Sequence, residues 1–393
     1  MTHFVDQISL PITISHGEGC YVIDTDGKRY LDFIGGWCVA SVGWGNVEIR
    51  EALTEETKRG TYIPPLFRSD ACEDLATELV AVAPGKMQKV FPCTSGSEAV
   101  DMAIKCVRAA TGKDVIISID EVYHGHTYGA LSIGEARKRV SGSILPSCQT
   151  LPMPGREMNS ERVLELLEKR LQKGDVAAFI SEPVWTNAGT HIPPPGFYET
   201  VQTLCRKQNA LLVMDEVATG FGHCGTLFGS ELWNLEPDLL CIGKAFTGGY
   251  ATMAALLTTE DVWKKSKGIP CYSTFAWLPT DLAATRANVN IILRDRLWEN
   301  AKVVGAHLLS LLELLEKLSV VKEVRGIGLL FAIELKNPDL RLTIQQECAE
   351  EGLLIETDIP GKSLFFTPPL ILSKKEAEEG AGILKTVLTR HSA

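Results

Sequence analysis

The sequence predicts an α/β fold with a mainly parallel β-sheet. Short apolar runs recur along the 393-residue chain, and each is followed by a turn signal. This pattern is typical of strands that are buried on both faces of a parallel sheet. Segments with the spacing of amphipathic helices lie between several of these runs, as parallel connections require. A chain of this length is expected to form about two or three domains with a large core.

Two of the apolar runs end in residues that could carry chemistry. Residues 211–214 lead into Asp215, and residues 239–243 lead into Lys244. Because ligands bind beyond the carboxyl ends of parallel strands, the acid and the amine should reach the same edge of the sheet. A lysine amine can form a Schiff base with pyridoxal phosphate, and a carboxylate can keep the ring nitrogen of that cofactor protonated. A capped turn and a solvated lysine explain this stretch, taken alone, equally well.

The stretch DEVATGFG, followed by PDLLCIGKAFTGG, resembles the core motif of class III aminotransferases, which include ornithine, acetylornithine, GABA and omega-amine transaminases. In that family the Asp binds the pyridine nitrogen and the Lys carries the cofactor, and the spacing of 29 residues agrees. The resemblance implies that Lys244 and Asp215 are catalytic and that pyridoxal 5′-phosphate is the cofactor. It also implies the fold type I architecture of these enzymes: a large domain with a mainly parallel seven-stranded sheet, plus a smaller α+β domain.

The other elements follow from local signals in chain order. A hairpin is predicted over residues 21–31 because two short strands flank the turn Asp26-Gly27. Helices are predicted at 46–58, 70–82, from Ser95 onward, and around 198–208; further strands are predicted at 115–119 and 177–180.

The pattern changes near residue 296, where a long helical segment begins. It is followed by helices at 343–351 and 374–389 and by strand candidates at 328–335, 353–356 and 364–367. We therefore expect residues 1–45 to be an N-terminal segment of the small domain, 46–295 the large cofactor-binding domain, and 296–393 the C-terminal part of the small domain.

Composition excludes several other classes of function. The net charge of −10 argues against a nucleic-acid partner. No apolar run approaches membrane-spanning length, and the N-terminus lacks the features of a secretory signal. The eleven cysteines show no metal-ligand spacing, so we expect no metal site and reduced thiols in a cytoplasmic protein.

A glycine-containing turn at Ser95-Gly96-Ser97-Glu98 opens a helix with a capping-box pattern. A helix N-terminus of this kind can bind an anion, although an ordinary capped helix explains the residues equally well. In class III enzymes the same turn holds the cofactor phosphate. The resemblance therefore implies phosphate contacts from Ser95, Gly96 and Ser97.

Further cofactor contacts are implied by the resemblance alone. An aromatic-His-Gly sequence in the family places Tyr123 and His124 at the cofactor, with Tyr123 stacked on the pyridine ring and Val217 on its other face. The family places Glu182 beneath the cofactor. Thr274 matches a threonine that crosses a homodimer interface to the phosphate of the partner subunit.

Departures from the family pattern concern the substrate. The usual run E-P-x-Q-G-E has Trp185 for its Gln and Asn187 for its second Glu. The arginine that grips a substrate carboxylate before Pro-Pro-Leu is replaced by Phe365. We expect a more apolar pocket, with Trp185, Phe365 and Trp37 as walls, and Arg68 is the nearest candidate for a replacement cation.

The function expected from these residues is transfer of an amino group from a primary amine or omega-amino compound to a keto acid or aldehyde, by ping-pong chemistry. Two related activities stay open: a racemase or aminomutase with the same cofactor, and a biosynthetic aminotransferase for an amino sugar or a carrier-bound aldehyde. A cofactor-binding regulator would need an appended DNA-binding module, which the sequence does not indicate.

Overall fold

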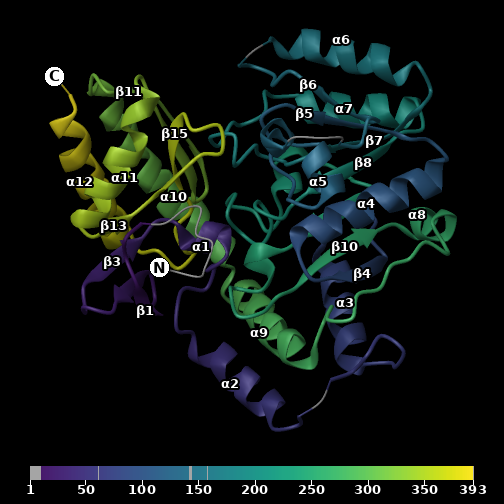
Figure 1. Cartoon of the computed structure of the whole chain (residues 1–393), viewed down its shortest axis with the longest axis horizontal. Coiled ribbons are helices and arrows are strands. Elements are labelled where there is room, and N and C mark those ends of the chain that lie inside the picture. Colours follow the sequence, from purple (N-terminus) through teal and green to yellow (C-terminus); the bar gives the residue numbers. More distant parts are fainter. Residues whose placement is uncertain (1–9, 61, 141–143, 157, 393) are drawn as a thin grey trace.

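The computed structural model describes residues 10–60, 62–140, 144–156 and 158–392. Figure 1 shows a larger body around one long sheet and a smaller body that contains both the first and the last elements of the chain. The start of the expected N-terminal segment, residues 1–9, lies outside the described residues. No helix among the described residues has the length and apolar character needed to cross a membrane.

The larger body contains a seven-stranded sheet, as expected. Its strand order is β4-β10-β9-β8-β7-β5-β6. Strand β10 is antiparallel to both of its neighbours, and the other adjacent pairs are parallel, so the sheet is mainly parallel. In spatial order the strands are β4 (Lys89–Cys93), β10 (Ala254–Thr258), β9 (Leu239–Ile242), β8 (Leu211–Asp215), β7 (Val176–Ser181), β5 (Val115–Ile119) and β6 (Cys148–Leu151).

The central strands are apolar because helices cover both faces of the sheet. Every residue of β5, β7, β9 and β10 is buried. The burial of their Val, Ile, Leu and Ala side chains is the main stabilising contribution of this body. Its helices are α2 (Val47–Thr57), α3 (Asp70–Val82), α4 (Gly96–Thr111), α5 (Tyr128–Ser132), α6 (Ser160–Leu171), α7 (Phe197–Lys207), α8 (Glu260–Lys265) and α9 (Pro279–Asp295), with 3-10 turns η1 (Glu135–Arg139), η2 (Gly229–Trp233) and η3 (Lys244–Phe246).

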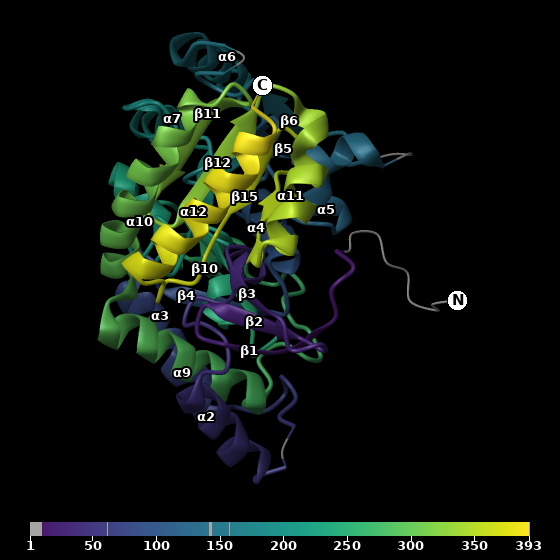
Figure 2. The ribbon, with the colours of Figure 1, turned by 90° about the vertical axis from the view of Figure 1, so that its left-hand side faces the viewer.

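The smaller body joins the two ends of the chain. Strand β3 pairs in parallel with β13, which lies more than 300 residues later in the sequence, and Figure 2 shows the N-terminal strands beside the C-terminal helices. This pairing places residues from both ends of the chain in one sheet, and the division at residues 45 and 295 stays a proposal. The N-terminal elements are β1 (Ile14–Glu18), β2 (Tyr21–Asp24), β3 (Arg29–Asp32) and α1 (Gly35–Cys38); the C-terminal ones are α10 (Leu297–Glu313), η4 (Leu314–Lys317), β11 (Val321–Ile327), β12 (Leu330–Leu335), η5 (Pro338–Leu340), α11 (Arg341–Glu350), β13 (Leu353–Leu354), β14 (Glu356–Thr357), β15 (Ser363–Phe366) and α12 (Lys374–Arg390).

Side-chain caps fix where several helices begin. Asn46 caps α2, and Ser373 forms a complete capping box with Glu376 on α12. At α4 the expected capping box is only half formed. The Ser95 hydroxyl accepts the Glu98 N–H at 3.2 Å, but the Glu98 carboxylate accepts the N–H and hydroxyl of Thr94 instead of the Ser95 N–H.

Candidate active site

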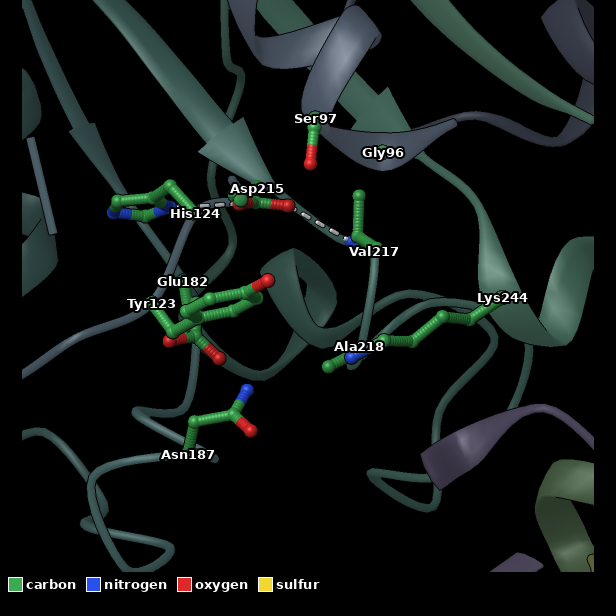
Figure 3. A pocket seen from close by; sticks show the side chains of 11 residues that line it. Gly96, Ser97, Tyr123, His124, Glu182, Asn187, Asp215, Val217, Ala218 and Lys244 are labelled. Atoms are coloured by element: carbon green, nitrogen blue, oxygen red, sulfur yellow. Dashed lines mark hydrogen bonds and ion pairs between the residues drawn. The ribbon is translucent and has the colours of Figure 1, made fainter. Parts of the chain in front are cut away.

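A cavity of about 150 Å³ opens where the carboxyl ends of β5, β7, β8 and β9 meet the N-terminus of α4. Figure 3 shows the Lys244 side chain reaching into it from one side, with Tyr123, Glu182 and Asn187 on the other. The strand order places these residues together, because the strands that precede them are neighbours in one sheet. The lining residues are Gly96, Ser97, Tyr123, His124, Gly125, Glu182, Asn187, Asp215, Val217, Ala218 and Lys244.

Asp215 is buried and held by a chain of hydrogen bonds. Its Oδ2 lies 2.7 Å from Nδ1 of His124 (Figure 3). The Nε2 of His124 lies 3.1 Å from the Ser118 hydroxyl. The imidazole therefore lies between the two groups, and a proton on Nδ1 is donated to the Asp215 carboxylate. The other oxygen, Oδ1, accepts the Val217 N–H at 3.1 Å. The carboxylate is therefore fixed in one orientation at the edge of the sheet.

Glu182 is a second buried carboxyl in the same cavity. Its Oε2 accepts hydrogen bonds from the backbone N–H of Thr186, at 3.2 Å, and from the Thr186 hydroxyl. Its Oε1 has no hydrogen-bond partner within the described part of the chain. Burial raises the pKa of Glu182 to about 7; the charge of Asp215 acts in the same direction, and those of His124 and Lys244 oppose it. Near neutral pH this group can hold a proton at the cavity.

Lys244 begins η3, directly after β9. Its backbone is left-handed, with φ of 47°, which is unusual for a residue with a side chain. Backbone strain of this kind is often found at functional sites, where the surrounding structure enforces it. The preceding residue, Gly243, packs close to Val217 and to the start of α4. A Cβ at Gly243 would stand 3.5 Å from Val217 and 3.6 Å from Gly96.

The other end of the cavity suits a phosphate. Helix α4 begins with Gly96 and Ser97, and the first amides of a helix have no partner inside it. These amides and the helix dipole favour an anion. Gly96 and Gly125 keep the end open, since a Cβ at Gly96 would lie 2.7 Å from Val217 and one at Gly125 would lie 2.3 Å from the Ser97 hydroxyl. The residues present therefore fit a phosphorylated aromatic aldehyde whose phosphate lies at α4 and whose ring lies beside Asp215.

Tyr123 provides the flat surface that a ring needs. It lines the cavity from the loop after β5, while Val217 lines it from the loop after β8. The pKa of Tyr123 is raised to about 12, first by burial and then by the negative charge of Asp215. Its hydroxyl thus stays protonated, and its ring offers an uncharged face for stacking.

Two residues expected to form apolar walls lie behind the cavity. Trp185 is fully buried in the core, where its ring packs edge-on against Phe197 and its Nε1 donates to the Ser181 hydroxyl at 3.0 Å. The prediction that Trp185 lines the pocket does not match this position. Phe365 is 5% exposed and packs in a small apolar cluster with the cavity residue Ala218. It supports the wall without lining the cavity.

Trp37 also lies elsewhere than expected. Residues 35–38 all have φ between 55° and 63°, which makes one turn of left-handed helix. This turn directs Trp37 outward, so that 54% of its surface is exposed and its Nε1 donates to Glu356 at 2.9 Å. The next residue, Cys38, is buried in the cluster that contains Phe365 and Ala218. The glycine-rich sequence before Trp37 and Cys38 does not by itself predict which of these two residues faces the core.

Three further predicted residues do not line the cavity in this chain. Ser95 caps α4 immediately before the cavity residue Gly96. Arg68 and Thr274 are exposed, and the loops that carry them are connected by a hydrogen bond of 3.0 Å from the Tyr62 hydroxyl to the Thr274 carbonyl. The roles predicted for Arg68, as a replacement cation, and for Thr274, at the phosphate of a partner subunit, therefore stay predictions.

Sequence reasoning missed three residues. Gly125 and Ala218 line the cavity, and their positions next to His124 and Val217 could have indicated it. His223 is fully buried near the site, and both of its ring nitrogens lack hydrogen-bond partners among the described residues. No local pattern distinguished it from an ordinary loop histidine.

Comparison with known proteins identifies the family. Residues 4–388 match the family described as aminotransferase class-III. The chain belongs to the class III aminotransferases. It is 32% identical over 388 residues to the acetylornithine aminotransferase of Methanothermobacter thermautotrophicus, an alignment that covers 96% of this chain and 94% of that one. It is 30% identical over 408 residues to the alanine/serine racemase of Pyrococcus horikoshii, covering 96% and 86%.

A solved structure has the same fold. The amine transaminase from an uncultivated Pseudomonas species, in its PLP-bound form, superposes with a TM-score of 0.94, 28% sequence identity and 99% coverage of both chains. These findings confirm the fold class, the cofactor and the reaction class predicted from the sequence: this aminotransferase catalyses pyridoxal phosphate-dependent transamination.

Proposed function

We propose the following roles for the residues that line the cavity. The α4 N-terminus with Gly96 and Ser97 binds the phosphate, Tyr123 and Val217 enclose the ring, and Asp215 faces the ring nitrogen. Lys244 is the point of covalent attachment. The proposal is supported by the cavity lining, by the fixed orientation of Asp215 and by the amides at the start of a long helix.

When bound, the cofactor supplies an electron sink for the carbon that loses a proton. With the cofactor bound, Lys244 Nζ would take that proton from the substrate carbon and deliver it to the former aldehyde carbon of the cofactor, because its flexible stem reaches across the cavity (Figure 3). Asp215 stays oriented toward the ring through the His124–Ser118 chain. Glu182 lines the cavity and, with its pKa raised to about 7, can hold a proton there near neutral pH. Donor and acceptor use the same cavity in turn, which gives ping-pong kinetics.

The proposed amino donor is a primary amine with an apolar body. No arginine is among the residues that line the cavity of the described chain, and the position expected to hold one is Phe365, packed behind Ala218. A carboxylate buried there without a cation would lose its hydration without compensation. The absence of an arginine from this lining, among the described residues, is the observation on which the substrate assignment depends.

The nearest alternative cations are already paired. The loop at residues 358–363 contacts the cavity residue Asn187, because the Ile359 N–H donates to the Asn187 carbonyl at 3.1 Å. Lys362 on this loop pairs with Glu121 at 3.1 Å. Further cations in the same network, Arg156 and Arg325, pair with Glu121 and Glu334, each at 2.8 Å. These ion pairs leave the cations little capacity for a substrate carboxylate, so a keto acid acceptor must be bound by backbone N–H groups, by a residue of the partner subunit such as Arg68, or remain in solvent.

We propose that two copies form the active unit. The loops that carry Arg68 and Thr274 expose a group of large apolar side chains: Tyr62, Leu66, Phe67, Tyr272 and Phe275. Exposed apolar patches of this kind are typical of interaction surfaces. A second copy seated here would bury them and bring Thr274 to the partner's phosphate. The eleven free cysteines support a reducing, cytoplasmic setting for this dimer.

A donor screen tests the proposal. With pyruvate as acceptor, kcat/KM for apolar monoamines such as 1-phenylethylamine should exceed that for acetylornithine, ornithine and GABA. A second variant, Arg68→Ala, tests the acceptor site. It should lower kcat/KM for the keto acid if Arg68 binds the acceptor carboxylate, and it should leave the preference among amine donors unchanged. Strong preference for acetylornithine or GABA would overturn the substrate assignment. Chiral analysis of alanine incubated without an acceptor separates transamination from racemisation.

A further inference from the structure

A short loop of the smaller body contacts two segments of the cavity wall. This loop, residues 358–363, leads from β14 into β15. It is fixed from within, because Oδ1 of the buried Asp358 accepts the N–H of Lys362 at 2.6 Å and that of Ser363 at 3.0 Å. The 358–363 loop therefore has a defined shape with which it can hold other residues in place.

The first wall segment that it contacts carries Asn187, which lies in the loop after β7 and lines the cavity. Two backbone carbonyls of this segment accept hydrogen bonds from the smaller body. The Ile359 N–H donates to the carbonyl of Asn187 at 3.1 Å, and Nε of Arg325 donates to that of Gly189 at 2.8 Å. A Cβ at Gly189 would lie 3.0 Å from Oδ2 of Asp358. The position of Asn187 thus depends on the smaller body.

The second wall segment carries Tyr123. Two residues before it, Glu121 has only 11% of its side chain exposed, and its backbone is left-handed with φ of 63°. Each of its carboxylate oxygens has a cationic partner: Oε1 accepts from Lys362 at 3.1 Å, and Oε2 accepts from Arg156 at 2.8 Å. A left-handed backbone costs free energy at a residue with a side chain and persists where the surroundings enforce it. The two ion pairs provide such surroundings.

Arg156 connects the two wall segments inside the larger body. Its Nη1 donates both to Glu121, at 2.8 Å, and to Nε2 of His191, at 3.1 Å. Burial lowers the pKa of His191 to about 3, so the ring is neutral and Nε2 can accept. The backbone groups of His191 and Trp185 exchange two hydrogen bonds, at 3.0 and 3.1 Å, which close the base of the loop that carries Asn187.

The larger body also holds the backbone beside Tyr123. The Val122 carbonyl accepts the N–H of Glu135 at 2.6 Å, and a Cβ at Gly134 would lie 2.9 Å from that oxygen. Loss of the Glu121 ion pairs should therefore loosen this segment without unfolding it. The pair with Lys362 adds the contact to the smaller body, and through it the same loop holds both walls.

We propose that Glu121 and Lys362 are positioning residues that set the spacing between Tyr123 and Asn187 across the cavity. The inference rests on the proposed role of Tyr123 at the cofactor ring. The ion pair joins the 358–363 loop to the Tyr123 segment, while the Ile359 N–H of that loop holds Asn187. Without the pair the two walls can separate, so a bound substrate loses contacts that it makes in both the ground state and the transition state.

The test compares Glu121→Gln, Lys362→Met and the double variant with wild type, as full-length proteins loaded with pyridoxal phosphate. Each single variant should raise KM for 1-phenylethylamine about fivefold while kcat changes by less than about twofold, the pattern expected when uniform binding is lost. The visible circular dichroism band of the bound cofactor should lose amplitude, because it depends on the packing around the ring. The double variant should match Glu121→Gln, since that variant already lacks the pair. Lys362→Arg keeps the charge and should stay near wild type.

The matched control is Lys207→Met. Lys207 pairs with Glu168 at 3.2 Å between α7 and α6 of the larger body, so its loss should change neither KM nor the cofactor band. Wild-type values of both in the folded Glu121→Gln and Lys362→Met variants would overturn the inference. A rise in KM for the keto acid alone in Lys362→Met would also overturn it, because Lys362 would then bind the acceptor carboxylate itself.

Tyr123→Ala distinguishes this inference from the proposed function on which it rests. A cofactor band that is unchanged in Tyr123→Ala would refute the contact between Tyr123 and the ring. A band that changes in Tyr123→Ala but not in Glu121→Gln or Lys362→Met would leave that contact in place and refute only the positioning role.

Discussion

Glu182→Gln should raise the free energy of unfolding of the cofactor-free protein at neutral and higher pH, because it removes a carboxylate that is destabilising when buried and charged. Burial, with the charge of Asp215 in second place among the effects that raise it, moves the pKa of Glu182 from 4.5 to about 7. A carboxyl whose pKa is raised in the folded state binds more protons there than in the unfolded chain. Stability is therefore lost as the pH rises through the window from 4.5 to about 7, and below this window there is no penalty.

The size of the effect follows from the shift. A difference of about 2.5 units, from 4.5 to about 7, corresponds to roughly 3 kcal/mol of unfolding free energy above the window. Glutamine keeps the shape and can still accept the Thr186 hydrogen bonds with its amide oxygen, but it has no charge to desolvate. Relative to wild type, Glu182→Gln should be roughly 3 kcal/mol more stable at about pH 8 and similar at about pH 4, below the window.

Urea unfolding followed by circular dichroism, on both cofactor-free proteins at the two pH values, measures this difference. All other ionisable groups are shared, so their contributions cancel in the comparison between the proteins. The same stability difference between the two proteins at both pH values, or a wild-type protein that is more stable than Glu182→Gln at the higher pH, would refute the assignment of a raised pKa to Glu182. Glu182→Asp offers a second control, because it keeps the charge in the same buried setting.

The remaining predictions concern the proposed roles. Lys244→Ala should abolish the borohydride-reducible adduct seen by mass spectrometry; an adduct of the same kind in this variant contradicts the attachment site. Asp215→Asn should fold normally but lower kcat by about 10²-fold or more, since an amide cannot hold the ring nitrogen charged, and wild-type turnover would disprove this role. Verified heterodimers of Lys244→Ala with Thr274→Ala should recover partial activity, because one site then has all its contacts; no recovery argues against shared sites. Phe365→Arg should improve kcat/KM for acetylornithine relative to monoamines by about tenfold or more, and no change would place the specificity elsewhere.

The sequence predicted the sheet and most of the cavity because both depend on local features. Each central strand is a contiguous apolar run, and the residue after it is delivered to the sheet edge by the strand itself. Asp215 and Lys244 were therefore found from their positions at the ends of strands, whereas Tyr123 and Glu182 were implied by the family resemblance. The helix N-terminus at Gly96 was found from its cap in the same way.

The orientation of aromatic side chains could not be predicted in this way. Trp37 and Cys38 are neighbours, and the left-handed turn at residues 35–38 decides which of them faces the core. Gly35 is required in this turn because a Cβ there would lie 2.0 Å from the Thr367 carbonyl oxygen, a residue over 300 positions later. Trp185 was expected at the pocket, but its surroundings are set by Phe197 and Ser181 on other elements.

The sequence by itself thus determined the family, the fold class and the residues that reach the sheet edge, since these follow from runs and motifs that are contiguous in the chain. Only the tertiary structure decided the electrostatics of the site. The hydrogen bond between His124 and Asp215 joins residues 91 positions apart. Oε1 of Glu182 has no partner because no donor among the described residues packs against it. The loop after β8 that carries His223 is hydrogen-bonded to a hairpin of the smaller body. Hydrogen bonding and desolvation depend on every atom within a few ångströms, and the chain brings those atoms together only when it folds.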